Sequence, residues 1–425
     1  MTFPTEETIA AIATAIAAGH GGIAVIRISG PKAFEVGESI VSFSKEKVWH
    51  SHMVLYGHVM DADNNKQIDE VLVLPMKGPR SFTGEDIVEI HCHGGLIAVQ
   101  HVLERVLSHP AVRKAMPGEF SQRAVLNGRL DLTQAEAISE LIGARSRQAA
   151  QLAMVGINGE IQRRINTLRE SLLDQLSELE SRVDFEDELP PLNGTKVLNE
   201  IGKVQSELQK LIDDSRRGYF LRQGLKIALV GCPNVGKSSV LNRLSRRERA
   251  IVTDIPGTTR DLLESEIILG GVPITLLDTA GIRTTNDEIE KIGIARTQEA
   301  LMAADVVVLV FDLSLGWTEN DQALLTQIPK DAPKLIIGNK SDIQNTAKVR
   351  LQEQRIQEIK PDVTFSALTG KGEKDLIESL LKQCGAHETQ GLEVVLNERH
   401  LQLANKTVTA LERIKTVADQ KLPWD

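Results

Sequence analysis

Residues 231–238, GCPNVGKS, constrain the fold more than any other part of this 425-residue chain. They match the pattern G-x-x-x-x-G-K-[ST] and follow the apolar run KIALV at 226–230, which is the context that the pattern requires. Its glycines let backbone N–H groups approach phosphates, and the start of the following helix favours anions. We therefore expect a strand, a phosphate-binding turn and a helix, with Lys237 reaching the outer phosphates and the Ser238 hydroxyl binding Mg²⁺. A chance glycine-rich turn would not account for the further motifs downstream.

Two of those motifs would complete the phosphate end of the site. The sequence DTAG at 278–281 follows the apolar run PITLL, so Asp278 can hold Mg²⁺ through water and the Gly281 amide can sense the γ-phosphate. The loop TDIPGTT at 253–259 lies between the two motifs. Thr259 is then the natural second hydroxyl ligand for Mg²⁺ when this loop closes around the nucleotide.

The choice of base is predicted by NKSD at 339–342, which again ends a strand-like run. The Asp342 carboxylate can accept hydrogen bonds from the guanine ring N–H and amino group, and a buried aspartate would be left unpaired by adenine. SAL at 366–368 can offer a backbone N–H to the guanine oxygen. In order, each after a strand, these motifs predict a GTP hydrolase. The residues expected to contact GTP are Asn234, Val235, Gly236, Lys237, Ser238, Ser239, Thr253, Asp254, Ile255, Pro256, Gly257, Thr258, Thr259, Asp278, Thr279, Ala280, Gly281, Asn339, Lys340, Ser341, Asp342, Ser366, Ala367 and Leu368.

The group that activates water is not fixed by these motifs. A Ras-like enzyme places Gln directly after the DTAG-type motif, but Ile282 stands there in this chain and cannot orient water. The residues alone leave Asp287, Glu288 and Glu290 as alternatives, and each could equally belong to a solvated acidic loop.

Apolar periodicity divides the chain into four segments. Residues 1–125 alternate short apolar runs, such as IAVIRIS, with turns, which indicates an α+β domain. In residues 126–223 the apolar residues recur at spacings of three and four, which indicates amphipathic helices, and the Pro-bearing stretch 184–191 separates two of them.

The last two segments predict an insertion. Residues 224–386 alternate helical stretches with the runs KIALVG, PITLLD, DVVVLVFD, KLIIGN and DVTFS, as expected for a parallel α/β sheet buried on both faces. Residues 387–425 are helical again. We therefore predict an all-α domain into which a Ras-like α/β domain is inserted, preceded by the α+β domain.

Composition limits what this protein can be. A net charge of −9 argues against a broad basic face for nucleic acid. Cys92, Cys232 and Cys384 are far apart, which indicates a reducing compartment and no disulfide framework. The acidic N-terminus is unlike a signal peptide, and the chain lacks an apolar run of about 18 residues, so we expect a cytoplasmic protein with no membrane segment.

The chain resembles the MnmE (TrmE) family of tRNA-modification GTPases over nearly its whole length. Beside the nucleotide motifs, the resemblance rests on IRISG at 26–30, SFTGEDIVEIHCHGG at 81–95 and PGEFSQRAVLNGRLDLTQAEA at 117–137. Generic GTPases have no counterpart to the two longer segments. The resemblance implies an N-terminal folate-binding domain, a helical domain and the inserted GTPase domain.

The resemblance also implies a potassium-activated GTPase. Its K⁺ would be held by Asn234, Thr253, Ile255 and Thr258, and a monovalent cation beside the phosphates can stabilise transition-state charge as an arginine finger does. The family's water-orienting acid corresponds to Glu290. The expected catalytic residues are therefore Asn234, Lys237 and Glu290.

For the N-terminal domain the resemblance implies a homodimer that binds 5-formyltetrahydrofolate or a related one-carbon folate. The matching positions are Arg27, Glu89 and Arg129, whose charges suit the pterin and the folate carboxylates; the alternative for each is an ordinary surface salt bridge. The two histidines of His91-Cys92-His93 share a strand face, but a third ligand is not evident nearby, so we do not expect a metal there.

The implied reaction adds a carboxymethylaminomethyl or aminomethyl group to the 5-carbon of the wobble uridine of certain tRNAs, with an FAD-binding partner of the MnmG (GidA) family, expected as a heterotetramer. The family ends in a Cys-x-Gly-Lys tail, whereas this chain stops at Asp425. We expect GTP hydrolysis not to depend on that tail, because the nucleotide motifs lie elsewhere. Two alternatives stay open: a regulatory or ribosome-assembly switch without chemistry on RNA, and a folate-binding module whose GTPase controls assembly.

Overall fold

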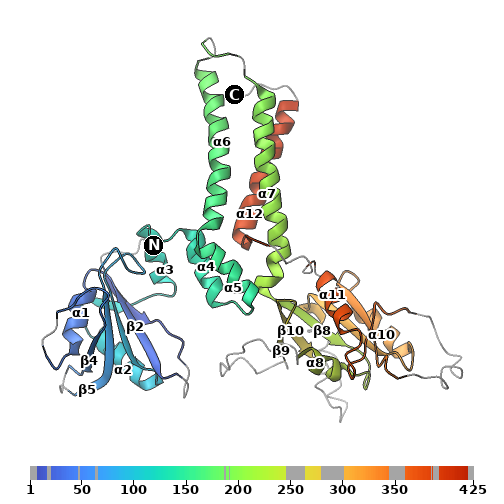
Figure 1. The fold of residues 1–425 in the computed structure, drawn as a ribbon, viewed down its shortest axis with the longest axis horizontal. Coiled ribbons are helices and arrows are strands. Elements are labelled where there is room, and N and C mark those ends of the chain that lie inside the picture. The colour runs from blue at the N-terminus through green and yellow to red at the C-terminus, as the bar shows by residue number, and fades with distance from the viewer. Residues whose placement is uncertain are drawn as a thin grey trace. The chain divides into compact units, whose positions relative to one another are not determined.

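The computed structural model describes residues 7–16, 21–45, 48–62, 66–185, 188–190, 192–245, 264–278, 301–343, 359–383, 385 and 392–419. The chain divides into two compact units, Met1–Glu136 and Ala137–Asp425. Figure 1 shows a β-sheet in each unit and long helices in the second.

The first unit is built on a seven-stranded sheet with the order β3-β4-β5-β6-β2-β1-β7. Its alternating pattern buries one set of side chains, including Ile26, Ile28 and Ile90, against helices on one face, as expected for half-buried strands. The elements are β1 (Thr8–Ile12), β2 (Ile23–Ser29), α1 (Ala33–Ile40), β3 (Val41–Ser42), β4 (Leu55–Met60), β5 (Gln67–Met76), β6 (Ile87–His93), α2 (Leu96–Leu107), β7 (Val112–Lys114) and α3 (Glu119–Leu126). The predicted α+β class is therefore confirmed.

Helices dominate the start of the second unit. They are α4 (Leu132–Ile142), which begins in the first unit, α5 (Arg147–Ile157), α6 (Glu160–Asp184) and α7 (Gly194–Gln223). The Asn193 side chain accepts a hydrogen bond from the Lys196 N–H and so caps the start of α7. The end of α6 and the start of α7 lie on either side of the predicted break.

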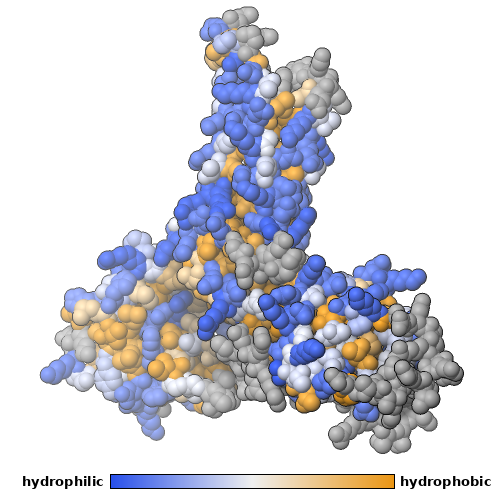
Figure 2. Space-filling model, turned by 45° about the vertical axis from the view of Figure 1, so that its right-hand side comes forward, coloured by the Kyte–Doolittle hydropathy of each residue, from blue (hydrophilic) through white to orange (hydrophobic). Residues whose placement is uncertain are grey.

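Segments before and after the α/β domain share one core. Val197, Ile201 and Leu208 of α7 pack in one cluster with Val394, Leu396 and the residues Ala404, Val408 and Leu411 of α12 (Glu398–Asp419). Figure 1 shows α12 alongside α7, and in Figure 2 the outer surface of these helices is largely hydrophilic. Burial of the shared apolar stripe explains why the helices stay together across the insertion.

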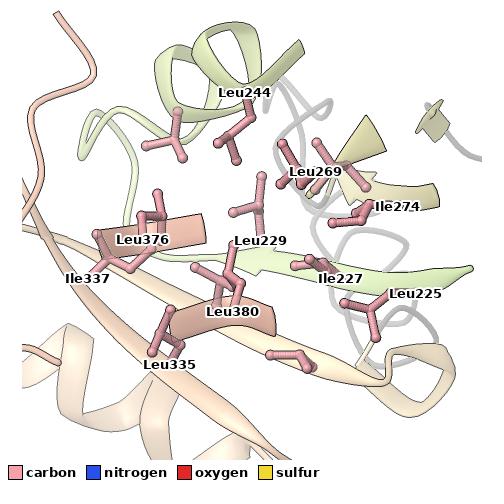
Figure 3. Packing of buried hydrophobic residues seen from close by; sticks show 14 of the residues in the cluster. Leu225, Ile227, Leu229, Leu244, Leu269, Ile274, Leu335, Ile337, Leu376 and Leu380 are labelled. Carbon is pink, nitrogen blue, oxygen red and sulfur yellow. The ribbon is translucent and has the colours of Figure 1, made fainter. Parts of the chain in front are cut away.

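The inserted domain is a six-stranded sheet with the order β13-β12-β11-β8-β10-β9. All pairs are parallel except the edge pair of β9 and β10. Figure 3 shows Ile227 and Leu229 of β8 packed among Leu376, Leu380 and other apolar side chains. The elements are β8 (Leu225–Val230), α8 (Lys237–Ser245), β9 (Glu264–Leu269), β10 (Val272–Asp278), β11 (Val306–Asp312), α10 (Glu319–Gln327), β12 (Lys334–Asn339), β13 (Val363–Thr364) and α11 (Glu373–Gln383).

None of the helices within the described ranges combines the length and the apolar character needed to cross a membrane.

Candidate functional site

The phosphate-binding turn lies between β8 and α8, where the sequence pattern places it. Gly236 has φ +96°, and an added Cβ would lie 2.4 Å from Asn339 Nδ2, so this position cannot take a side chain without strain and a clash. Asn234 also has a left-handed backbone, with φ +62°, and its side chain is exposed. Val235 between them is buried and anchors the turn to the core.

Lys237, the first residue of α8, lies over its own turn. Its Nζ donates to the carbonyl oxygens of Gly231 at 2.7 Å and Cys232 at 2.9 Å. Ser238 and Ser239 follow it and are exposed. One cation and a reachable hydroxyl therefore stand together at a helix N-terminus, which is the arrangement that suits phosphate and its metal.

Cys232 of the same turn is not a reactive group. Burial, followed by a hydrogen bond to Asp321, raises the pKa of the Cys232 thiol to about 11. The thiol thus stays protonated at neutral pH and acts as a small packing residue.

Asn339 joins the turn to the base-recognition motifs. It ends β12 and is almost fully buried. Its Nδ2 donates to the Val235 carbonyl at 2.9 Å, and its Oδ1 accepts from the Ala367 N–H at 3.1 Å. One amide side chain therefore connects three of the predicted motifs, which lie far apart in the sequence.

Lys340 makes a second connection. Its Nζ donates to the Asn234 carbonyl at 2.8 Å and to Asp312 Oδ2 at 2.7 Å. Burial alone would raise the pKa of Asp312, but the hydrogen bonds from Lys340 and Ser314 outweigh it and lower that pKa. Asp312 therefore stays ionised and holds the lysine in place.

Asp342 lies where the motif predicts but differs in burial. Its Oδ1 accepts a hydrogen bond from the fully buried Ser366 hydroxyl at 2.5 Å. The aspartate itself is exposed, not buried as the argument on base choice assumed. The reason is position: Asp342 stands three residues beyond the end of β12, outside the sheet edge.

These motifs surround one cavity of about 400 Å³. Three of its lining residues, Asn242, Arg243 and Ile343, were missed by the sequence reasoning, because they belong to none of the motifs. The other lining residues are Gly236, Ser239, Asn339, Lys340, Asp342, Ala367 and Leu368. The N–H of Ser341, the next residue of the motif, donates to the Phe365 carbonyl at 3.0 Å.

Several predicted residues cannot be placed. Thr253, Asp254, Ile255, Pro256, Gly257, Thr258, Thr259, Thr279, Ala280, Gly281 and Glu290 lie outside the described residues, as do Ile282, Asp287, Glu288 and Cys384. Asp278 ends β10, but only its backbone is described.

In the first unit the structure pairs two of the three residues expected to bind folate. Arg27 of β2 and Glu89 of β6 are opposite each other in the sheet register. Arg27 Nε and Nη2 lie 2.8 Å and 2.7 Å from Glu89 Oε1. The guanidinium carbon also lies 4.9 Å from the centre of the Phe82 ring and 5.6 Å from that of Phe120, within cation–π range.

Arg129 lies three residues after the end of α3. It is exposed, and its Cβ is close to Gly84, in the turn of the first signature segment. The neighbouring Asn127 donates to the Thr83 carbonyl at 2.8 Å and ties the two N-terminal signature segments together.

The His91-Cys92-His93 run ends β6. His93 bonds Asp69 at 2.6 Å, which raises the pKa of His93, whereas Cys92 is buried on the opposite face. Within the described ranges, no three His, Cys, Asp or Glu side chains gather closely enough to hold a metal ion.

A parallel α/β sheet with a G-x-x-x-x-G-K-S turn joined to an N-K-x-D motif defines the class of P-loop GTP-binding proteins. Comparison with known proteins narrows this class. Residues 8–129 match the family model described as the GTP-binding protein TrmE N-terminus, and residues 132–425 match the MnmE helical domain.

Curated relatives match along the whole chain. The tRNA modification GTPase MnmE of Prochlorococcus marinus (strain MIT 9303) is 66% identical over 422 residues, covering 99% of this chain and 91% of that protein. The protein of the same name from Synechococcus sp. (strain CC9902) is 61% identical over 422 residues, covering 99% and 92%. Among solved structures, Era of Aquifex aeolicus bound to GDP and AlF4⁻ is 28% identical, covers 37% of this chain and 56% of that chain, and has a TM-score of 0.30.

The chain belongs to the MnmE family of tRNA modification GTPases. It is thus an enzyme of the GTPase class. The signature segment at 81–95 lies within the matched N-terminal model, and the one at 117–137 extends from it into the matched helical domain.

Proposed function

We propose that the chain binds Mg²⁺–GTP in the cavity between the turn at 231–238 and the motif at 339–342, and hydrolyses it. This proposal rests on the two hydrogen bonds of the Asn339 side chain, one to the Val235 carbonyl and one from the Ala367 N–H. The link holds the phosphate-binding and base-binding segments around one space. Backbone N–H groups of the turn, held in place in this way, would stabilise the charge that develops on the phosphates.

The residues present fit the two implied cations. The Ser238 hydroxyl is exposed beside Lys237, as a Mg²⁺ ligand must be, with Thr259 as its proposed partner. The Asn234 side chain is exposed while Lys340 fixes its carbonyl, so its amide oxygen can turn to K⁺. Thr253, Ile255 and Thr258 are the other proposed K⁺ ligands. Such cations would supply positive charge against the phosphates.

Glu290 is proposed to orient the attacking water, since Ile282 cannot. The change Glu290→Ala should then reduce turnover and leave nucleotide affinity nearly intact. A loss of affinity instead would assign Glu290 a structural role.

We further propose that the first unit binds a tetrahydrofolate one-carbon donor. Glu89 Oε1 is taken by Arg27, but Oε2 faces His91 Nε2 at 3.6 Å, beyond hydrogen-bond range, so it remains able to accept a pterin N–H. Arg129 is proposed to meet the folate carboxylates from the neighbouring turn. We also propose that the domains of the chain meet at 125/126, 223/224 and 386/387.

As partners we propose a second copy of the chain, an FAD-dependent enzyme of the MnmG (GidA) type, and tRNA, whose wobble uridine would be modified on its 5-carbon in the cytoplasm. The net charge of −9 fits an arrangement in which the partner enzyme makes many of the contacts with tRNA. A regulatory switch without RNA chemistry is the alternative, and it leaves Arg27 and Glu89 only the role of a salt bridge.

The deciding experiment is nucleoside analysis of tRNA after reconstitution of the full chain with such an enzyme, GTP and a one-carbon folate. Modified uridine is expected, and its loss with Glu89→Gln but not with Glu35→Gln would assign the folate role. Unmodified tRNA with intact GTP turnover would favour the switch.

A further inference from the structure

Arg243 belongs to none of the sequence motifs, yet it lines the nucleotide cavity from α8. Its Nε donates to Glu373 Oε2 at 3.0 Å. The Glu373 side chain is only 7% exposed, whereas that of Arg243 is 31% exposed. A mostly buried carboxylate at the start of α11 is thus matched by a cation reaching from the helix that follows the phosphate-binding turn.

A second contact holds the same arginine. Gly370 has φ +84°, and an added Cβ would lie 2.0 Å from Arg243 Nη2. The guanidinium therefore lies directly against the Gly370 backbone. A guanidinium is planar, so its Nε can pair with Glu373 while its flat end lies against Gly370, a shape that a lysine ammonium does not have.

The loop held by these contacts, residues 366–373, carries the base-recognition groups. The Gly370 N–H donates to the Ser366 carbonyl at 2.8 Å, and the Glu373 N–H to the Gly370 carbonyl at 3.2 Å. Ser366 in turn holds Asp342, while the Ala367 N–H holds Asn339. A shift of this loop away from α8 would move both groups that align the base-reading residues.

We propose that Arg243 is a positioning residue for guanine recognition, which holds the loop 366–373 against α8 through Glu373 and Gly370. It joins the helix that carries Lys237 to the loop that aligns Asp342. The inference rests on the assignment of this cavity to guanine nucleotides. It concerns the precision of base reading, since Arg243 is not expected to touch the reacting phosphate.

The test compares full-length wild type, Arg243→Ala, Arg243→Lys and Glu373→Gln. Release of a fluorescent GDP analogue and of its inosine counterpart is measured in Mg²⁺ and K⁺. Inosine lacks the 2-amino group, so the ratio of the two rates reports how well Asp342 is aligned. Lys203→Ala, which breaks an exposed pair with Glu200 on α7, is the control for loss of an ion pair alone.

Arg243→Ala and Glu373→Gln should release GDP roughly three- to tenfold faster, with the guanine-to-inosine discrimination reduced. Arg243→Lys should be intermediate, and it carries the test if the alanine variant does not fold. Unchanged release and unchanged discrimination in all three variants would overturn the inference. An equal increase in the release rates of both nucleotides would also overturn it, because that result indicates a general loosening of the site. Wild type without a preference for guanine nucleotides would instead overturn the nucleotide assignment, and this inference with it.

Discussion

Lys340 Nζ lies 2.8 Å from the carbonyl oxygen of Asn234, so the guanine motif directly supports the turn that faces the phosphates. Asn234 is held in a left-handed conformation there, and Asp312 holds the lysine from the other side. Base recognition and the proposed cation ligand are therefore mechanically connected through one ammonium group.

Replacing Asp312 should weaken that connection. Asp312→Asn removes the charge opposite Lys340, and we expect GTP affinity to fall by about 1–2 kcal/mol. Because folding lowers the pKa of Asp312, its contribution to folding stability is present above the unfolded value of 3.8 and is lost as pH falls through the lowered one. Titration calorimetry measures the affinity; Ser314→Ala, which keeps the lysine contact, is the control. Unchanged affinity in Asp312→Asn would refute the connection.

Glu119 should stabilise the first unit in a pH-dependent manner. It is buried and accepts hydrogen bonds from Arg113 and Arg123. Burial opposes ionisation, but these bonds prevail and lower the pKa of Glu119 to about 2. Its stabilisation is therefore present above the ordinary glutamate pKa of 4.5 and lost as pH falls toward 2.

Glu119→Gln should thus cost about 3 kcal/mol at pH 7, because the buried Arg123 loses one of its two carboxylate partners and keeps Glu85 at 3.2 Å. Thermal unfolding of the full chain at pH 7, 5 and 3 measures this, and the difference between variant and wild type should shrink at pH 3. The exposed pair of Lys32 and Glu35 provides the control Glu35→Gln, with an expected cost below about 1 kcal/mol. Equal effects of the two changes would contradict the role of burial.

Exchanging K⁺ for Na⁺ should lower GTP turnover by on the order of a hundredfold, because a cation beside the phosphates stabilises transition-state charge. Asn234→Ala should remove the difference between the two salts. Steady-state kinetics at constant ionic strength measure it, with the exposed Asn199→Ala of α7 as the matched control. Equal turnover of wild type in both salts would remove the potassium role.

Asp342→Asn should move the preference from guanine toward xanthine, since an amide presents a donor where the carboxylate presented an acceptor. Competition between GTP and XTP for the bound fluorescent analogue measures the change. A variant that still prefers GTP would show that another residue reads the base.

The strands of the inserted domain were predictable because burial on both faces leaves continuous apolar runs. β11 is buried at all seven positions and matches DVVVLVFD closely. β9 was not among the strands predicted for this domain: it reads ESEIIL, half polar because it forms the antiparallel edge. Short or edge strands take their structure from neighbours and leave little pattern of their own.

The site was predictable only where residues sit in motifs. Asn339, Lys340 and Ser366 lie around one cavity with the turn, as their spacing after strands implies. Arg243 could not be found, because its partner Glu373 is 130 positions away and the contact depends on tertiary packing. The exposure of Asp342 is likewise set by where β12 ends.

The most direct test of the account is the affinity of the full chain for GTP and ATP in Mg²⁺ and K⁺, measured by competition against a bound fluorescent GDP analogue. We predict that GTP binds roughly a hundredfold or more tightly than ATP, because guanine offers the Asp342 carboxylate a ring N–H and an amino group and adenine offers neither at those positions. Equal affinity for the two nucleotides, or binding of neither, would contradict it.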